Sequence, residues 1–196
     1  FCGYHGWQDW YISKTSMNSG IPNEISSYSH RFAYNDIKSL ENLLINFKGD
    51  VACIILEPIS KVKPICGVKC KFCKKHCEGF LKKVRWLADK HKVILIFDEV
   101  VTGFRWSIGG YQKVCGVTPD LACFSKAIAN GMPLSVLAGK KDIMKKSDEI
   151  FYSLTFGGEA LSLAAAIFTI KFLENYNVCE KIHENGSFLL SKINKL

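Results

Sequence analysis

Two uninterrupted apolar runs of strand length, with an amphipathic helix between them, constrain the fold of this chain more than any other feature. The runs are VACIIL at 51–56 and VILIF at 93–97, and apolar residues recur at helical spacing within 80–91. Strands without polar alternation are typical of a parallel sheet that helices cover on both faces. The sequence therefore predicts an α/β fold, with a mostly parallel sheet and helices on both faces.

The rest of the chain continues this pattern without a linker or an internal repeat. A helix is expected over 36–47, with Asn35 or Asp36 as its N-cap. Further elements are expected as strands over 121–124 and 134–138 and as helices over 159–174 and 178–193. We therefore expect the 196 residues to form one domain, 1–196.

Composition excludes several classes of protein. With 48% hydrophobic and 22% charged residues the chain can bury a sizeable core, so it is not a disordered protein. No apolar run reaches the roughly 20 residues of a membrane-spanning helix, so we expect no membrane partner. Among the nine cysteines, Cys53, Cys115 and Cys123 have apolar neighbours, as small buried hydrophobes would. We therefore expect a reduced, cytoplasmic protein rather than a secreted disulfide framework.

The net charge of +8 has one dense stretch, 61–85, which holds nine lysines and arginines against the single acid Glu78. Such a stretch is either a solvated surface or a site that attracts polyanions. Aromatic residues are scarce among these basic ones, so nucleic-acid binding is the less favoured interpretation.

A cysteine cluster falls inside this stretch, in a Cys- and Lys-rich insertion expected over 60–79. Its thiols are Cys66, Cys70, Cys73 and Cys77. This spacing is compatible with a Zn²⁺ ion or an Fe–S cluster. The alternative is a divergent, solvated surface insertion. Together with the charge, the cluster leaves open a different class of function, a basic metal-bearing module that binds nucleic acid.

Two reactive side chains follow expected strands. Asp98 comes directly after the run 93–97, and Lys126 comes two residues after the run 121–124. The carboxyl ends of strands in open α/β sheets are where ligands bind. A lysine desolvated by apolar neighbours can act as a Schiff-base nucleophile, and an acid at a strand end can pair with the pyridinium nitrogen of pyridoxal. A structural ion pair is the alternative for such residues.

Several strings carry a more specific indication. They are YHGW at 4–7, DEVVTGFR at 98–105, PDLACFSK at 119–126, NGMP at 130–133 and LTFGG at 154–158. In this order they resemble the motifs of the class III pyridoxal-phosphate aminotransferases, and the glutamate-1-semialdehyde aminomutase-like group is the most similar branch. The resemblance covers most of the chain and implies the large domain of a fold type I enzyme.

The resemblance implies a role for two catalytic residues. Lys126 would form the internal aldimine with pyridoxal 5′-phosphate and later move a proton, and Asp98 would pair with the pyridine nitrogen. Around the ring, Tyr4 would stack on one face and Val100 on the other. Tyr4 and Val100 could instead be ordinary core residues.

Four further positions carry weaker implications. His5 and Gly6 would shape the loop that covers the cofactor, although His5 could be an ordinary loop histidine. Thr155 would reach the cofactor phosphate of a partner subunit, or else be a helix N-cap. Glu57 would lie on the substrate side of the site. If Thr155 acts in this way, the active unit is a homodimer with shared active sites.

The implied activity is amino-group transfer between a small-molecule amino donor and a keto or aldehyde acceptor. Whether the enzyme is a transaminase or an aminomutase stays open. The family's phosphate-cradling segment before Tyr4 and its C-terminal small domain are not among these 196 residues, which implies a domain incomplete at both ends. A family member that has lost catalysis is a further alternative.

Overall fold

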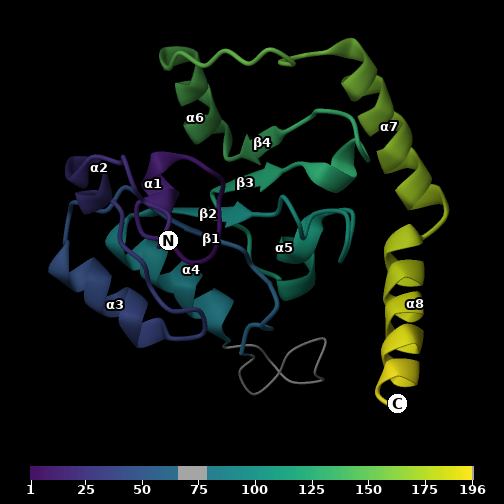
Figure 1. Ribbon diagram of the computed structural model, residues 1–196, viewed down its shortest axis with the longest axis horizontal. Coiled ribbons are helices and arrows are strands. Elements are labelled where there is room, and N and C mark those ends of the chain that lie inside the picture. Colours follow the sequence, from purple (N-terminus) through teal and green to yellow (C-terminus); the bar gives the residue numbers. More distant parts are fainter. Residues whose placement is uncertain (66–78, 196) are drawn as a thin grey trace. The chain divides into compact units, whose positions relative to one another are not determined.

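The structure is a computed structural model that describes residues 1–65 and 79–195 (Figure 1). It divides into two compact units, 1–98 and 99–196. The expectation of one large domain over 1–196, with an insertion over 60–79, stays a prediction. Each unit is described in turn.

The first unit contains the predicted strand–helix–strand segment. Its elements are α1 (Asp9–Ile12), α2 (Asn23–Ser27), α3 (Ile37–Asn46), β1 (Cys53–Leu56), α4 (Phe80–His91) and β2 (Ile94–Asp98). The helix expected over 80–91 is confirmed, and so is Asp36 as the N-cap of α3, since its carboxylate accepts the N–H groups of Lys38 and Ser39. Both strands begin later than their apolar runs.

Strands β1 and β2 run parallel, with Cys53 opposite Ile94. The N-terminal segment joins β1, because Cys2 forms a parallel bridge with Leu56 and its N–H donates to the Ile55 carbonyl at 3.0 Å. The last three residues of β1 are buried, which is typical of a strand covered on both faces. The α/β class is confirmed.

Helix α4 supplies the main apolar layer of this unit. It packs against β2 and against α3, which lies beside it in Figure 1. Its buried residues are Phe80, Leu81, Val84, Leu87 and Ala88. Each large apolar side chain buried in this way contributes about 1.5–3 kcal/mol to folding. The layer therefore fixes the position of β2, whose last residue is Asp98.

The second unit is built around an antiparallel strand pair. Its elements are α5 (Gly110–Cys115), β3 (Leu121–Phe124), the 3₁₀ helix η1 (Lys126–Ile128), β4 (Val136–Gly139), α6 (Lys141–Met144), the 3₁₀ helix η2 (Lys145–Glu149), α7 (Ala160–Asn175) and α8 (Val178–Ile193). The expected strand over 134–138 is β4, and it pairs antiparallel with β3, with Phe124 opposite Val136. Only a short connection joins the two strands, so the chain reverses direction, whereas a parallel partner needs a longer crossover.

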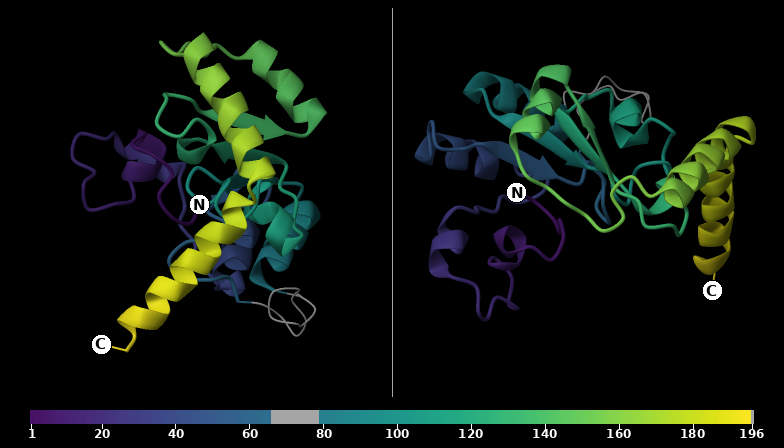
Figure 2. Two further views of the ribbon diagram at one scale, coloured as in Figure 1. Left: turned by 90° about the vertical axis from the view of Figure 1, so that its right-hand side faces the viewer. Right: turned by 90° about the horizontal axis from the view of Figure 1, so that it is seen from above.

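A small apolar core holds this unit together. Phe104, Ile128, Ala129, Ala166 and Leu173 form a buried cluster, to which η1 contributes Ile128 and α7 contributes Ala166 and Leu173. Helix α8, by contrast, buries none of its residues, and Figure 2 shows it projecting away from β3 and β4. The unit thus exposes much apolar surface on its two long helices.

Two expectations from composition can be compared with the described residues. None of the helices in 1–65 and 79–195 is long and apolar enough to cross a membrane. The cysteines at 2, 53, 115, 123 and 179 are all free thiols. The expectation that Cys53 is a buried hydrophobe is wrong, because it opens β1 at the one exposed position of that strand.

Candidate functional site

Asp98 ends β2 with a buried side chain, and its partner comes from the other end of the same unit. Nδ1 of His5 lies 2.7 Å from Oδ2 of Asp98, and Nε2 of the same ring lies 3.0 Å from the carbonyl oxygen of Cys2. The pairing of Cys2 with β1 anchors this loop. The role expected for His5, shaping a loop, did not include this contact, since 93 positions separate the two residues and no periodicity links them.

The neighbours of His5 in its motif lie differently. Tyr4 is 64% exposed, so it is not a core residue, and the described unit leaves its ring accessible to a ligand. Gly6 has φ +111°, a left-handed conformation that side chains rarely adopt. Glu57, which follows β1, is half-buried, and its Cγ would lie 3.9 Å from a Cβ added at Gly3. Of the predicted set, the first unit therefore holds Tyr4, His5, Gly6, Glu57 and Asp98.

Glu99, the first residue of the second unit, is 0% exposed. Its carboxylate accepts hydrogen bonds from the Thr102 hydroxyl and from the backbone N–H groups of Tyr111, at 2.8 Å, and Gln112, at 2.9 Å. These two N–H groups belong to the first turn of α5, where backbone donors have no acceptor within the helix itself, so Glu99 caps that helix from outside. Val100 follows in the turn and is half-buried.

The close fit around Glu99 explains a glycine. At Gly110, with φ +73°, an added Cβ would lie 2.5 Å from Oε1 of Glu99. Sequence reasoning assigned no function to Glu99. The signal that was available is an acid beside the Asp98 position, followed by glycines at 109–110.

Lys126 lies at the first position of η1, just after β3, and the residue is exposed. The expectation that apolar neighbours desolvate its side chain is wrong for this structure, because they bury the chain on either side of the lysine and not the lysine itself. Its backbone has φ +47°, in the left-handed region that costs a non-glycine residue about 1 kcal/mol.

Hydrogen bonds hold that strained conformation. The Ser125 hydroxyl donates to the Leu134 carbonyl at 2.8 Å, and the Asn130 N–H donates to the Lys126 carbonyl at 3.1 Å. Such a strained conformation persists only when the surroundings fix it, and it is most common at functional sites. The conformation is thus consistent with the role predicted for Lys126.

Thr155 lies in an exposed turn before α7. It is not the N-cap of that helix, because the Glu159 carboxylate accepts the N–H groups of Leu161 and Ser162 and the Ser162 hydroxyl. These bonds, led by that of the Ser162 hydroxyl, lower the pKa of Glu159. Of the two interpretations of Thr155, the cap is wrong and the phosphate contact stays a prediction.

The predicted metal ligands Cys66, Cys70, Cys73 and Cys77 lie outside the described residues. Within 1–65 and 79–195, no group of three or more His, Cys, Asp or Glu side chains could hold a metal ion. The cysteine cluster therefore stays a prediction.

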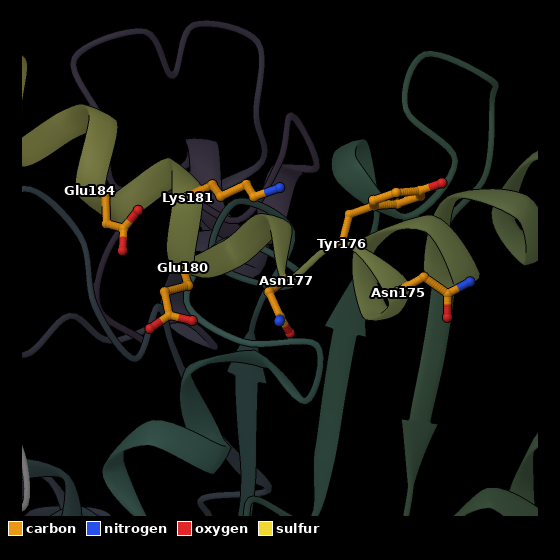
Figure 3. Close-up of a pocket in the computed structure, with 6 residues that line it drawn as sticks. All are labelled: Asn175, Tyr176, Asn177, Glu180, Lys181 and Glu184. Atoms are coloured by element: carbon orange, nitrogen blue, oxygen red, sulfur yellow. The ribbon is translucent and has the colours of Figure 1, made fainter.

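A hollow of about 350 Å³ lies at the junction of α7 and α8, away from every predicted site residue in sequence. Figure 3 shows the six residues that line it, from the end of α7 and the first turns of α8: Asn175, Tyr176, Asn177, Glu180, Lys181 and Glu184. None of them has a hydroxyl or thiol nucleophile paired with a base, so we assign no chemistry to this hollow.

The chain is similar in sequence to several known enzymes. The chain is 38% identical over 195 residues to the 3-aminobutyryl-CoA aminotransferase of Cloacimonas acidaminovorans, matching 99% of this chain and 45% of that protein. It is 33% identical over 208 residues to the glutamate-1-semialdehyde 2,1-aminomutase of Methanococcoides burtonii, matching 99% of this chain and 47% of that protein. The chain thus spans less than half the length of these relatives.

Solved structures with the same fold include the following two. The internal aldimine form of the FumI protein of Sphingopyxis sp. MTA144, which holds pyridoxal phosphate, matches 97% of this chain and 44% of its own, with a TM-score of 0.82 and 26% identity. The acetylornithine aminotransferase of Elizabethkingia anophelis matches 85% of this chain and 40% of its own, with a TM-score of 0.70 and 32% identity. The family model for "Aminotransferase class-III" matches residues 3–196, and the chain belongs to that family.

Proposed function

We propose that this chain is part of an enzyme that transfers amino groups with pyridoxal 5′-phosphate. The observation that carries the proposal is the buried Asp98 carboxylate at the end of β2, held by His5. A buried acid with a fixed partner suits a pyridinium nitrogen, which must keep its proton for the ring to act as an electron sink. Family membership supports the same chemistry.

The residues present fit two groups of the cofactor. The Asp98 carboxylate suits the ring nitrogen, and the exposed Lys126 amine, on a backbone that is fixed in a strained conformation, suits the aldehyde carbon. When bound, the cofactor supplies an electron sink for the substrate carbon that loses a proton. Lys126 Nζ then takes that proton and returns it, as general base and general acid.

An amino donor and a keto or aldehyde acceptor are the substrates we propose. The named relatives include both an aminotransferase and an aminomutase. The two chemistries differ in one measurable requirement: a transaminase needs a separate acceptor, whereas an aminomutase returns the amino group to a neighbouring carbon of one substrate. Turnover with and without added keto acid distinguishes them.

Absorbance spectroscopy of the full-length protein with pyridoxal phosphate tests the proposal. We expect a visible band that Lys126→Ala abolishes, together with a loss of activity of at least about 1000-fold. Lys113→Ala is the matched control, because Lys113 lies on α5 and outside the predicted set, and it should leave the band intact. A folded protein without the band would contradict the proposal.

We propose further that the enzyme is a homodimer in which Thr155 serves the partner's cofactor phosphate. The segment around Thr155 supports this, since it exposes large apolar side chains: Ile150 65%, Phe151 96%, Leu154 71% and Phe156 55%. Apolar patches of this kind are typical of surfaces that another protein covers.

Sedimentation of the full-length protein tests the dimer. Phe151→Asp should weaken association at least about tenfold, because it places a charge in an apolar interface. Met17→Asp is the matched control, since Met17 is 82% exposed but lies in the first unit. A monomeric parent protein, or an unchanged dimer in Phe151→Asp, would contradict this assignment.

A further inference from the structure

Two serines continue the pairing of β3 and β4 at the end of the strands that leads to Lys126. Phe124 lies opposite Val136 in the last backbone pair of these strands. Extending this register by one position places Ser125 opposite Ser135. Their side chains meet there, with the Ser135 Oγ 3.1 Å from the Ser125 Oγ. A hydrogen bond between side chains therefore closes this end of the strand pair.

The acceptors fix the direction of the hydrogen bonds that Ser125 makes. Its Oγ lies 2.8 Å from the carbonyl oxygen of Leu134, which can only accept, so the single Ser125 hydroxyl proton is donated there. The Ser135 hydroxyl must then be the donor in the serine pair, and the Ser125 oxygen its acceptor. Ser125 is half-buried, whereas Ser135 is exposed. The exposed serine thus orients the hydroxyl of the more buried one.

The main chain of Ser125 provides a second attachment. Its carbonyl oxygen accepts the N–H of Ile128 at 3.2 Å, and Ile128 belongs to the buried apolar cluster of this unit. The chain turns sharply here, from extended at Ser125, with φ −161°, to left-handed at Lys126, with φ +47°. A residue other than glycine keeps a left-handed conformation only where its neighbours fix it. Ser125, attached through both its side chain and its main chain, fixes it from the preceding position.

We propose that Ser125 is a positioning residue for Lys126, and that Ser135 orients its hydroxyl. The bond to the Leu134 carbonyl ties the residue before the lysine to the segment that leads into β4. The direction in which the lysine side chain leaves the backbone depends on this attachment. The inference rests on the proposed function, in which the Lys126 amine must reach the aldehyde carbon of the cofactor. An amine held in the reactive direction reacts faster than one that must first reach it.

Amide hydrogen exchange in the full-length protein without cofactor tests the attachment. The Asn130 N–H, which donates to the Lys126 carbonyl at 3.1 Å, reports on this turn. In Ser125→Ala its exchange should be about three- to tenfold faster, the effect of losing one hydrogen bond. Ser125→Thr keeps the hydroxyl and should restore the parent rate. An unchanged exchange rate in Ser125→Ala would overturn the proposal.

The rate at which the visible band forms after pyridoxal phosphate is added tests the consequence. Stopped-flow absorbance should show formation at least about tenfold slower in Ser125→Ala and near the parent rate in Ser125→Thr. Ser147→Ala is the matched control, because the Ser147 hydroxyl also donates to a carbonyl, that of Met144, but lies on η2. It should leave both rates unchanged. Faster exchange with a parent-like rate of band formation would show that the Ser125 hydroxyl supports local structure alone, and would overturn the proposal.

Ser135→Ala repeats both measurements at an exposed position, where the change leaves no buried group unpaired. It removes only the donor that orients Ser125, so both effects should keep their direction and be smaller, about two- to threefold. Parent-like values in both measurements would overturn the role of Ser135. A folded parent protein without a band would refute the proposed function, whereas the exchange rates, read without cofactor, decide independently whether Ser125 fixes the turn.

Discussion

Asp98 and Glu99 are adjacent carboxylates, both buried, with opposite kinds of partners. Glu99 accepts three hydrogen bonds from neutral donors, two of them backbone N–H groups at the start of α5. Asp98 is paired through Oδ2 with the ionisable ring of His5. The first arrangement stabilises a turn and a helix, and the second holds a carboxylate in place at a strand end.

These two adjacent residues therefore have different expected roles, Glu99 in folding and Asp98 in the chemistry of the site. Neutral donors satisfy a buried carboxylate without creating a site, so we expect changes at Glu99 to affect folding first. Asp98 is the residue that we propose to pair with the cofactor nitrogen, so we expect changes at Asp98 to affect cofactor chemistry first. Each prediction below tests one side of this comparison.

The largest effect on stability is expected for Glu99→Ala. It removes the acceptor shared by the Thr102 hydroxyl and the N–H groups of Tyr111 and Gln112, so the free energy of unfolding should fall by about 3–5 kcal/mol. Denaturant unfolding of the full-length protein measures this. Glu99→Gln, which keeps one acceptor oxygen, should lose clearly less, and equal losses in both variants would contradict the assigned contacts.

Asp98→Asn should show the opposite profile. Its volume and burial are unchanged, so the free energy of unfolding should change by less than about 1.5 kcal/mol. Activity should fall at least about 100-fold, because the amide cannot keep the cofactor nitrogen protonated. Steady-state kinetics measures the activity of this variant, and denaturant unfolding measures its stability. A variant with near-normal kcat would refute the role of Asp98.

Gly110→Ala sharpens the account of Glu99 through a matched pair of glycines. At Gly110 an added Cβ meets Glu99 at 2.5 Å, whereas at Gly116, with φ +66°, it meets nothing within 4 Å. Gly116→Ala should therefore lose only about 1 kcal/mol through its backbone conformation. Gly110→Ala should lose about 1–2 kcal/mol more, and equal losses would show that the Glu99 contact is not close.

Much of the fold could be predicted from apolar periodicity, which depends only on local sequence. The helices over 80–91 and 178–193 and the strand over 121–124 have the predicted bounds. The antiparallel direction of β4 was not predicted, because an apolar run specifies a strand but not its partner's direction.

For the candidate site, too, only the features that depend on local sequence could be predicted. Asp98 and Lys126 were predicted as site residues because each follows an apolar run, and ligands bind at the carboxyl ends of such strands. The His5–Asp98 contact could not be found, since it joins positions 93 apart and depends on Cys2 pairing with β1. The exposure of Lys126 was mispredicted, because flanking apolar residues indicate burial of the chain and not the direction of one side chain.

The smallest effect is expected at Glu159, a capping carboxylate on the surface. Its hydrogen bonds to Ser162 and to the N–H of Leu161 lower its pKa, so the cap stabilises α7 above the ordinary glutamate pKa of about 4.3 and is lost as the pH falls through the lowered value. A carboxyl NMR titration should give a midpoint below that of an ordinary glutamate. In Ser162→Ala the midpoint should rise toward the ordinary value, and an unchanged midpoint would contradict the cap.

The most direct test of the central claim is to map where pyridoxal phosphate attaches. The full-length protein is incubated with the cofactor, reduced with borohydride to make the attachment permanent, digested and analysed by mass spectrometry. The account predicts the added mass on the peptide that contains Lys126, with little elsewhere. Attachment at another lysine, or no attachment to a folded protein, would contradict it.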